Sequence, residues 1–552
     1  MQSSHAAARV SARFDDPNLV GYGGLAPVVR LAERCGLPAL VDERVRLPAS
    51  KDGTGAFPAA KLMSLVGGMI AGADSINDMD RLRHGGLPRL FSGVRAPSTL
   101  GSYLRSFSHG HVKQLHAVAR RFLPELAAHT PLLPGADQVA YVDIDDTIRR
   151  TYGYGKQGAG YGYSKVKGLN ALIGIVSTPL AAPVIAATRL RKGPSNSARG
   201  AAAFVAESIR TARACGASGL LVVRADSAFY GADVVNACRA LGVRFSVIVR
   251  MNASVKAAIA GIDEAAWKAI KYPKAVWDEE AQCWISDAEI AETTYTAFTS
   301  KPKKQQVTGR LIVRRVKRLN PAAVPEGQGT LFDTWRYHAA FADSPLSLSD
   351  AERDHRRHAV VEQVIADLKN GPFAHAPSEH FQANAAWLAL AALAHNLTRA
   401  AGALASAFHA KATTATIRDH LINVPARLAR SARRLTLHLP EHWPWADALR
   451  PGARATTHRL RSPDHPARKG PRPPNTWKSW TDHRVLPART ARSSRRPPGH
   501  PETITPESSR WIRAYVQQSE TSDEKEVRCN SGDKFRAASR CESGPRRRQS
   551  PR

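Results

Sequence analysis

A strand that ends in three carboxylates is the feature that most restricts how this chain can fold. Residues 141–147 read YVDIDDT, so an apolar pair is followed by Asp143, Asp145 and Asp146 within four positions. Packed carboxylates repel one another and lose hydration on burial. Either the strand runs out into an acidic, solvated turn, or a cation binds at its end. A divalent metal ion is the usual cation at such a place.

The charge of the chain points to a polyanionic partner. Its 552 residues include 79 Lys and Arg against 47 Asp and Glu, which gives a formal net charge of +32. Nucleic acid is the first candidate partner, and an acidic membrane surface is the second. The longest apolar stretches, such as AAWLALAALAH, are far shorter than the ~20 residues that span a bilayer. We therefore expect DNA rather than a membrane.

Cysteine usage and the N-terminus indicate a cytoplasmic protein. The six cysteines are scattered without a CxxC pair, so neither a zinc site nor a disulfide framework is expected. The first residues, MQSSHAAARVSARF, contain no continuous apolar segment of a secretory signal. We expect a reducing cytoplasm and association with the nucleoid. The composition, rich in Ala and Arg, suggests a bacterial gene of high GC content.

Composition and periodicity divide the first half of the chain into three regions. Residues 1–135 carry apolar residues at helical spacing and are predicted to form a helical region that either binds DNA ends or only packs. Residues 136–250 are predicted to contain elements in the order β-β-β-α-β-α-β, which describes a mixed sheet with helices on its faces. Residues 251–345 hold tryptophans, charged turns and strand candidates, which indicates a β-rich insertion.

The remainder is predicted to be helical and then disordered. Within residues 346–450 we expect a helix at 356–371, ended by a Gly-Pro pair, and a buried helix at 378–404 that is apolar almost all round. Helical patterns continue to about residue 450. Residues 451–552 contain 23 Lys and Arg, 10 Asp and Glu, and 13 of the 36 prolines. This composition predicts a disordered basic tail.

Two strands offer carboxylates at their ends. Asp143 and Asp145 are two residues apart and therefore point to the same face of their strand, whereas Asp146 points to the other face. Asp226 ends a second apolar strand, LLVVRAD. The two strand ends could lie side by side at one edge of the sheet. Alternatively, Asp226 could simply cap the turn that follows it.

A helix offers a third acid together with a cation. Glu362 and Lys369 lie on nearly the same face of the predicted helix, since seven steps of ~100° almost complete two turns. On this helix face, the acid would bind a metal ion and the lysine would bind a phosphate. Both residues could instead be ordinary surface charges.

The order strand-Asp, strand-Asp, helix-Glu resembles the DDE-type transposases of bacterial insertion sequences, specifically the class with a group 1 DDE domain. The resemblance is carried by DIDDT with the Gly/Tyr loop after it, VVRADSAFY, AVVEQVIADLKNG followed by AHNLTRAAG, and residues 416–445. It covers most of residues 10–450. It implies an α/β fold with an RNase H-like core, in which the β-rich insertion precedes the last catalytic acid.

The resemblance also implies a mechanism. Asp145, Asp226 and Glu362 are the implied catalytic acids, and they hold two Mg²⁺ ions, for which Mn²⁺ can substitute, about 3.5–4 Å apart. One ion activates water and later a DNA 3′-OH, and the other stabilises the leaving oxygen. The implied partner is double-stranded DNA, namely the terminal inverted repeats of the element and the target DNA. We expect a homodimer on DNA.

The chain departs from the related signature Tyr-x2-Arg-x3-Glu-x6-Lys. His355 and His358 stand where that signature has Tyr and Arg. The Glu–Lys half is intact, so Lys369 remains the implied phosphate ligand. Arg357 and His358 are candidates to replace the missing arginine.

Tryptophans in the insertion are further candidates for DNA contacts. In related enzymes the insertion carries a Trp that stacks on a flipped base near the transposon end. Trp267, Trp277 and Trp284 are candidates here, and Trp267 is the first choice. Each of them could instead pack within a core or a hairpin.

Two other functions fit parts of the same sequence. Asp143-x-Asp145-x-Thr147 also fits the motif of haloacid dehalogenase-type phosphatases, in which the first Asp is a nucleophile and the second an acid/base. That chemistry requires Asp143 and makes no use of Glu362. The other alternative is a DNA-binding, decayed transposase without catalysis.

Overall fold

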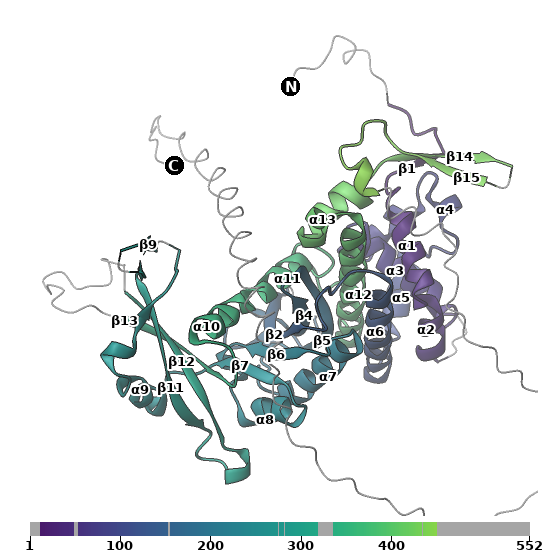
Figure 1. Cartoon of the computed structure of the whole chain (residues 1–552). Helices are drawn as coiled ribbons and strands as arrows, with labels where there is room; N and C mark the ends of the chain where they lie inside the picture. The colour runs from purple at the N-terminus through teal and green to yellow at the C-terminus, as the bar shows by residue number, and fades with distance from the viewer. Residues whose placement is uncertain are drawn as a thin grey trace, which may run out of the picture. The chain divides into compact units, whose positions relative to one another are not determined.

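The computed structural model describes residues 12–48, 53–152, 155–273, 275–280, 282–317, 335–432 and 434–449. All of them belong to the first of two compact units, Met1–Leu460. The predicted disordered tail at 451–552 lies outside the described residues, as does the extreme N-terminus. Figure 1 shows the course of the chain and the labels used below.

The N-terminal region is helical, as predicted. A strand of two residues, β1 (Leu19–Val20), precedes the helices. The helices are α1 (Leu25–Arg34), α2 (Leu37–Arg44), α3 (Pro58–Ile70), α4 (Leu87–Leu90), α5 (Pro97–Arg105) and α6 (His109–His129). They form because apolar residues recur at helical spacing. In α6, for example, Leu115, Val118 and Phe122 are fully buried along one stripe.

A mixed sheet forms the centre of the described chain. Its first strands are β2 (Val139–Arg150), β3 (Gly160–Tyr161), β4 (Lys167–Thr178), β5 (Ala181–Lys192), β6 (Leu220–Ala225) and β7 (Arg244–Ile248). β2, β6 and β7 are parallel, whereas β2, β4 and β5 pair antiparallel in turn. Helices α7 (Ala201–Ala214) and α8 (Ala232–Ala240) make the crossovers between β5, β6 and β7. The predicted order of elements, and with it the RNase H-like fold, is confirmed.

The predicted insertion continues this sheet. Its elements are α9 (Ala253–Ala260), β8 (Lys268–Ala269), β9 (Val276–Asp278), β10 (Cys283–Ile285), β11 (Ala288–Ala297), β12 (Val307–Lys317) and β13 (Trp335–Ala342). β13 pairs antiparallel with β7, so the strand order runs β3-β4-β2-β6-β7-β13-β12-β11-β8, with β5 beside β4. Strand β7 is therefore covered at an edge that would otherwise offer unpaired backbone groups.

Two helices after the insertion bring the chain back to the sheet. The helix predicted at 356–371 is observed as a 3-10 turn at Arg357–Ala359 followed by α11 (Val360–Lys369), and a separate helix, α10 (Leu348–Arg356), precedes it. Helix α11 packs against β2. The predicted buried helix is α12 (Phe381–Ala405), which packs against β5, α6 and α3.

The prediction of helices up to residue 450 is wrong in part. Short helices α13 (Ala407–Lys411) and α14 (Thr414–Ile417) are followed by a hairpin of β14 (Ala426–Ser431) and β15 (Arg434–His438). The hairpin pairs with β1. Ala426 and Leu428 are buried while Arg427 between them is exposed, which is the alternation of a strand with one covered face.

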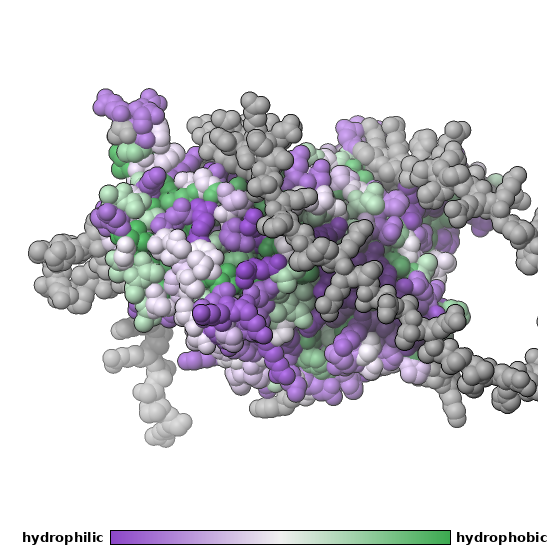
Figure 2. Space-filling view, turned by 60° about the horizontal axis from the view of Figure 1, so that its bottom comes forward, coloured by the Kyte–Doolittle hydropathy of each residue, from purple (hydrophilic) through white to green (hydrophobic). Residues whose placement is uncertain are grey.

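The surface is mixed in character. On the face shown in Figure 2, hydrophobic residues lie in patches between hydrophilic ones. Among the described helices, none has the length and apolar character that a membrane crossing requires.

Candidate active site

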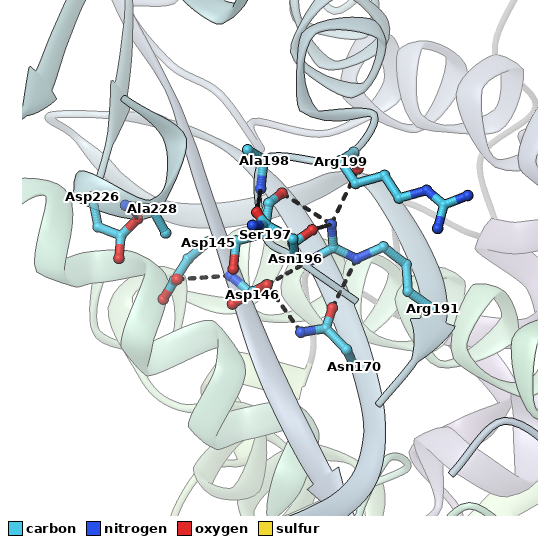
Figure 3. Close-up of polar contacts among 10 residues, drawn as sticks. All are labelled: Asp145, Asp146, Asn170, Arg191, Asn196, Ser197, Ala198, Arg199, Asp226 and Ala228. Atoms are coloured by element: carbon cyan, nitrogen blue, oxygen red, sulfur yellow. Dashed lines mark hydrogen bonds and ion pairs between the residues drawn. The ribbon is translucent and has the colours of Figure 1, made fainter. Parts of the chain in front are cut away.

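Strand pairing brings two of the predicted acids together. In the parallel pairing of β2 with β6, Asp143 lies opposite Arg224 and Ile144 opposite Ala225. Asp145 follows Ile144, and Asp226 follows Ala225, so each carboxylate comes directly after the last residue of this pairing. Figure 3 shows their carboxylates beside each other. The expected adjacency therefore arises because the carboxyl ends of neighbouring parallel strands meet at one edge.

Asp145 is held in a place that disfavours its charge. Burial, with smaller contributions from the charges of Asp226 and Asp146, raises the pKa of Asp145 to about 7. The backbone N–H of Asp146 donates a hydrogen bond of 2.7 Å to Asp145 Oδ1, and His358 is close enough to oppose the shift. Within the described part of the chain, Asp145 forms no ion pair. A cation bound beside such a carboxylate would stabilise its charged form.

Asp226 both caps a turn and faces Asp145. Its Oδ1 accepts a hydrogen bond of 3.0 Å from the N–H of Ala228, so it caps the 3-10 turn at Ser227–Phe229. Burial raises the pKa of Asp226, while His358 lowers it. The capping alternative is thus correct, and it fixes the carboxylate in place at the end of β6.

Asp143 is neutralised by the protein itself. Arg224 donates two hydrogen bonds to it, from Nε to Oδ1 at 2.7 Å and from Nη2 to Oδ2 at 2.8 Å. His358 Nδ1 lies 3.0 Å from the same Oδ1. Asp143 is 0% exposed, and Arg224 covers the ring of Tyr141 at 4.0 Å. A carboxylate enclosed in this way cannot reach a phosphate, so the geometry does not support a phosphatase nucleophile at Asp143.

Asp146 is neutralised on the opposite face of β2. Its Oδ2 accepts hydrogen bonds from Arg191 Nη2 at 2.5 Å and from Asn170 Nδ2 at 2.9 Å. Arg191 Nε also donates to Asn170 Oδ1, and its Nη1 donates to three carbonyls of the loop before α7, at residues 196, 197 and 199 (Figure 3). Asp146 therefore anchors a loop and is not aimed at the Asp145–Asp226 pair.

Glu362 and Lys369 lie on the helix that covers β2. Glu362 is exposed in the first turn of α11, and Lys369 is half-buried in its last turn. Burial lowers the pKa of Lys369, Arg149 lowers it further, and Asp145 opposes the shift. Lys369 is therefore close to both residues. Among the described residues, no three His, Cys, Asp or Glu side chains come together closely enough to hold a metal ion. The structure thus joins two of the three predicted acids.

The other predicted DNA contacts are engaged within the protein. Arg357 lies 3.8 Å from Asp354, and His358 contacts Asp143. Arg315 stacks on Trp267 at 4.2 Å, so one face of this half-buried indole is covered. Trp277 and Trp284 face each other across the β9–β10 hairpin with ring centroids 5.0 Å apart.

Sequence reasoning missed the two arginines that neutralise Asp143 and Asp146. Arg224 lies within the apolar run LLVVRAD, and Arg191 lies within TRLRK at the end of β5. Both are buried, at 2% and 8% exposure. A charged residue inside a buried strand was the available signal, because such a residue requires a partner of opposite charge.

Comparison with known proteins gives the family of the chain. The sequence matches the family described as "Transposase DDE domain group 1" over residues 2–460. No curated protein sequence matches it. Among solved structures, the chain is similar to the piggyBac transposase in a cryo-EM synaptic complex with hairpin DNA. The identity is 11% and the TM-score 0.34, with 72% of this chain and 79% of that chain covered.

Proposed function

The chain belongs to the transposase DDE domain group 1 family, and we propose that it cuts DNA at the ends of an insertion sequence and joins those ends to target DNA. The proposed catalytic acids are Asp145, Asp226 and Glu362. One observation carries the proposal: Asp145 and Asp226 lie half-buried side by side without an ion pair among the described residues. Arginines neutralise Asp143 and Asp146 on either side.

The donor set fits divalent metal ions. Carboxylate oxygens are the ligands that Mg²⁺ and Mn²⁺ prefer. A cation bound between Asp145 and Asp226 would offset the burial and the neighbouring negative charges that raise the pKa of both carboxyl groups. When bound, such ions supply Lewis-acid activation of the attacking hydroxyl and stabilisation of the leaving oxygen.

The position of Glu362 in the sequence supports it as the third ligand. His358 precedes it by one helical turn, and Lys369 follows it by about two turns. The charge of His358 acts on Asp145 and Asp226, and Lys369 interacts with Asp145. Glu362 thus lies between two points at which this segment approaches the carboxylate pair.

The remaining side chains of the site bind and orient the substrate in this proposal. Lys369, which is half-buried at the end of α11, contacts a phosphate of the DNA. The protein acts as a homodimer that holds two terminal repeats. No side chain forms a covalent bond to DNA.

A cleavage assay tests the proposal. Purified protein is incubated with a labelled duplex that contains the sequence flanking its own gene, with and without Mg²⁺. We expect nicking that requires Mg²⁺ and that is lost in Asp145→Asn, Asp226→Asn and Glu362→Gln. Binding without nicking by the wild type would indicate a decayed transposase. Nicking that survives Glu362→Gln would exclude Glu362 as a ligand.

A further inference from the structure

Arg149 of strand β2 lies on the same face of the strand as Asp145 and has no role in the account above. Side chains alternate along a strand, so Asp145, Thr147 and Arg149 point to one face of β2 and Asp146, Ile148 and Arg150 to the other. The face that carries Asp145 is the one covered by α11, whose Lys369 lies close to Asp145 and Arg149. The opposite face, with Ile144, is covered by α7.

Arg149 has a hydrogen-bond donor that the described residues leave unused. Its Nε is buried and has no hydrogen-bond partner. Buried polar groups are almost always paired, so an unpaired guanidinium nitrogen requires an explanation. Neither Arg149 nor Lys369 forms an ion pair with any described residue. Two like charges held close together are unfavourable unless an anion binds between them.

We infer that Arg149 and Lys369 together bind a DNA phosphodiester next to the scissile one. This inference rests on the proposed function, and it assigns to Arg149 the substrate contact that neither Arg357 nor His358 is free to make. Arg357 lies near Asp354, and His358 Nδ1 is engaged by Asp143.

The spacing along β2 indicates which phosphate is bound. Arg149 follows Asp145 by four residues, which corresponds to about 13 Å along a strand. The two side chains therefore serve different points of the substrate. Asp145 serves the reacting phosphate, and the guanidinium holds a flanking phosphate, to which it can donate two parallel hydrogen bonds. A bound DNA strand would then follow β2 from Asp145 toward Arg149.

Arg150 is a matched control for Arg149. It is the next residue of the same strand, it has the same charge, and it is exposed on the opposite face. Arg149→Gln and Arg150→Gln therefore change the net charge equally and differ only in the face of β2 that they alter. Arg149→Lys retains the charge and removes the fork of donors.

The experiment measures binding of the full chain to the gene-flanking duplex in Ca²⁺, with single phosphates replaced one at a time by neutral methylphosphonates. In the wild type, we expect one substitution near the cleavage point to weaken binding about ten- to a hundred-fold. Arg149→Gln should weaken binding to unmodified DNA by a similar factor and lose its sensitivity to that one substitution. It should also reduce the slope of log K against log salt by about one. Arg150→Gln should keep the sensitivity.

The outcomes separate this inference from the proposed function. If the wild type nicks DNA and Arg149→Gln retains the methylphosphonate sensitivity, the phosphate assignment is wrong and the transposase proposal stands. If the wild type neither binds nor nicks the duplex, the proposed function itself fails. A loss of binding by Arg149→Gln that is accompanied by a lower melting temperature is resolved with Arg149→Lys. That variant should fold normally, retain most of the salt slope and bind with intermediate affinity.

Discussion

Arg224 holds Asp143 through two parallel hydrogen bonds of 2.7 and 2.8 Å, and both side chains are almost completely buried. The same guanidinium donates to the backbone carbonyl of Asp354 in α10. The hydroxyl of Tyr141 donates to the carboxylate of Asp354 at 2.7 Å. One buried arginine thus ties β2 and β6 to the segment that leads into α11. This connection fixes where helix α11 meets the sheet.

Removing one partner of this pair should destabilise the fold strongly. Asp143→Leu leaves the charge of Arg224 buried without its counter-ion, and we expect a loss of about 3–5 kcal/mol in the free energy of unfolding. Arg224→Met should cost a similar amount. The double variant should lose much less than the sum of the two. Urea unfolding followed by tryptophan fluorescence measures all three. Additive losses would show that the two residues do not depend on each other.

The network on the other face of β2 should control the mobility of one loop. Arg191→Gln removes donors to the carbonyls of residues 196, 197 and 199 and leaves Asp146 without its counter-ion. Amide hydrogen exchange in residues 193–200 should accelerate about ten-fold or more, which corresponds to about 1.4 kcal/mol of local stability. Arg189→Gln is the control, since Arg189 pairs with Glu207 in α7. Equal exchange in both variants would contradict the anchoring role.

The adjacency of Asp145 and Asp226 could be predicted because it depends on local patterns. Each residue follows an apolar strand, and the ends of parallel strands meet at one edge. The partners of Asp143 and Asp146 could not be predicted, since Arg224 and Arg191 reach them only through the register of β2 with β6 and the fold of the loop after β5. A residue pair far apart in sequence leaves no local pattern.

One error of secondary structure and one unpredicted strand pairing have physical causes. The hairpin of β14 and β15 was expected to be helical because RLARSARRL has apolar residues at a spacing that suits a helix. The following RLTLHL alternates, and this alternation indicated a strand. The β-rich character of the insertion was predicted correctly, but not that β13 extends the core sheet by pairing with β7. That pairing is a tertiary contact that strand propensity does not specify.

The tryptophans of the insertion should differ in their roles. Trp277 is 40% exposed on the β9–β10 hairpin, while one face of Trp267 is occupied by Arg315. We expect Trp277→Ala to weaken binding to the end duplex by about 1–3 kcal/mol, the usual contribution of one stacked base. Trp267→Ala should instead lower the melting temperature. Quenching of 2-aminopurine placed near the end reports the stacking, and quenching that survives Trp277→Ala but not Trp267→Ala would reverse this assignment.

The two carboxylates of β2 that share a face should affect stability in opposite directions. The pKa of Asp145 is raised to about 7, so the folded protein binds a proton between pH 4 and pH 7 that the unfolded chain has released. Stability therefore falls as the pH rises through this window. Asp145→Asn should remove a penalty of up to about 4 kcal/mol at pH 8, and its effect should vanish near pH 4.

Asp143→Asn is the matched control for this last prediction. The charge of Arg224 helps to hold the pKa of Asp143 below its usual value although burial opposes the shift, so its carboxylate stabilises the fold at neutral pH and loses this contribution as the pH falls. At pH 8, melting temperatures should rise in Asp145→Asn and fall in Asp143→Asn. Mg²⁺ should raise the melting temperature of the wild type, because it binds the folded carboxylates, and should raise that of Asp145→Asn much less. A Mg²⁺ shift that is unchanged in Asp145→Asn would mean that the ion binds elsewhere.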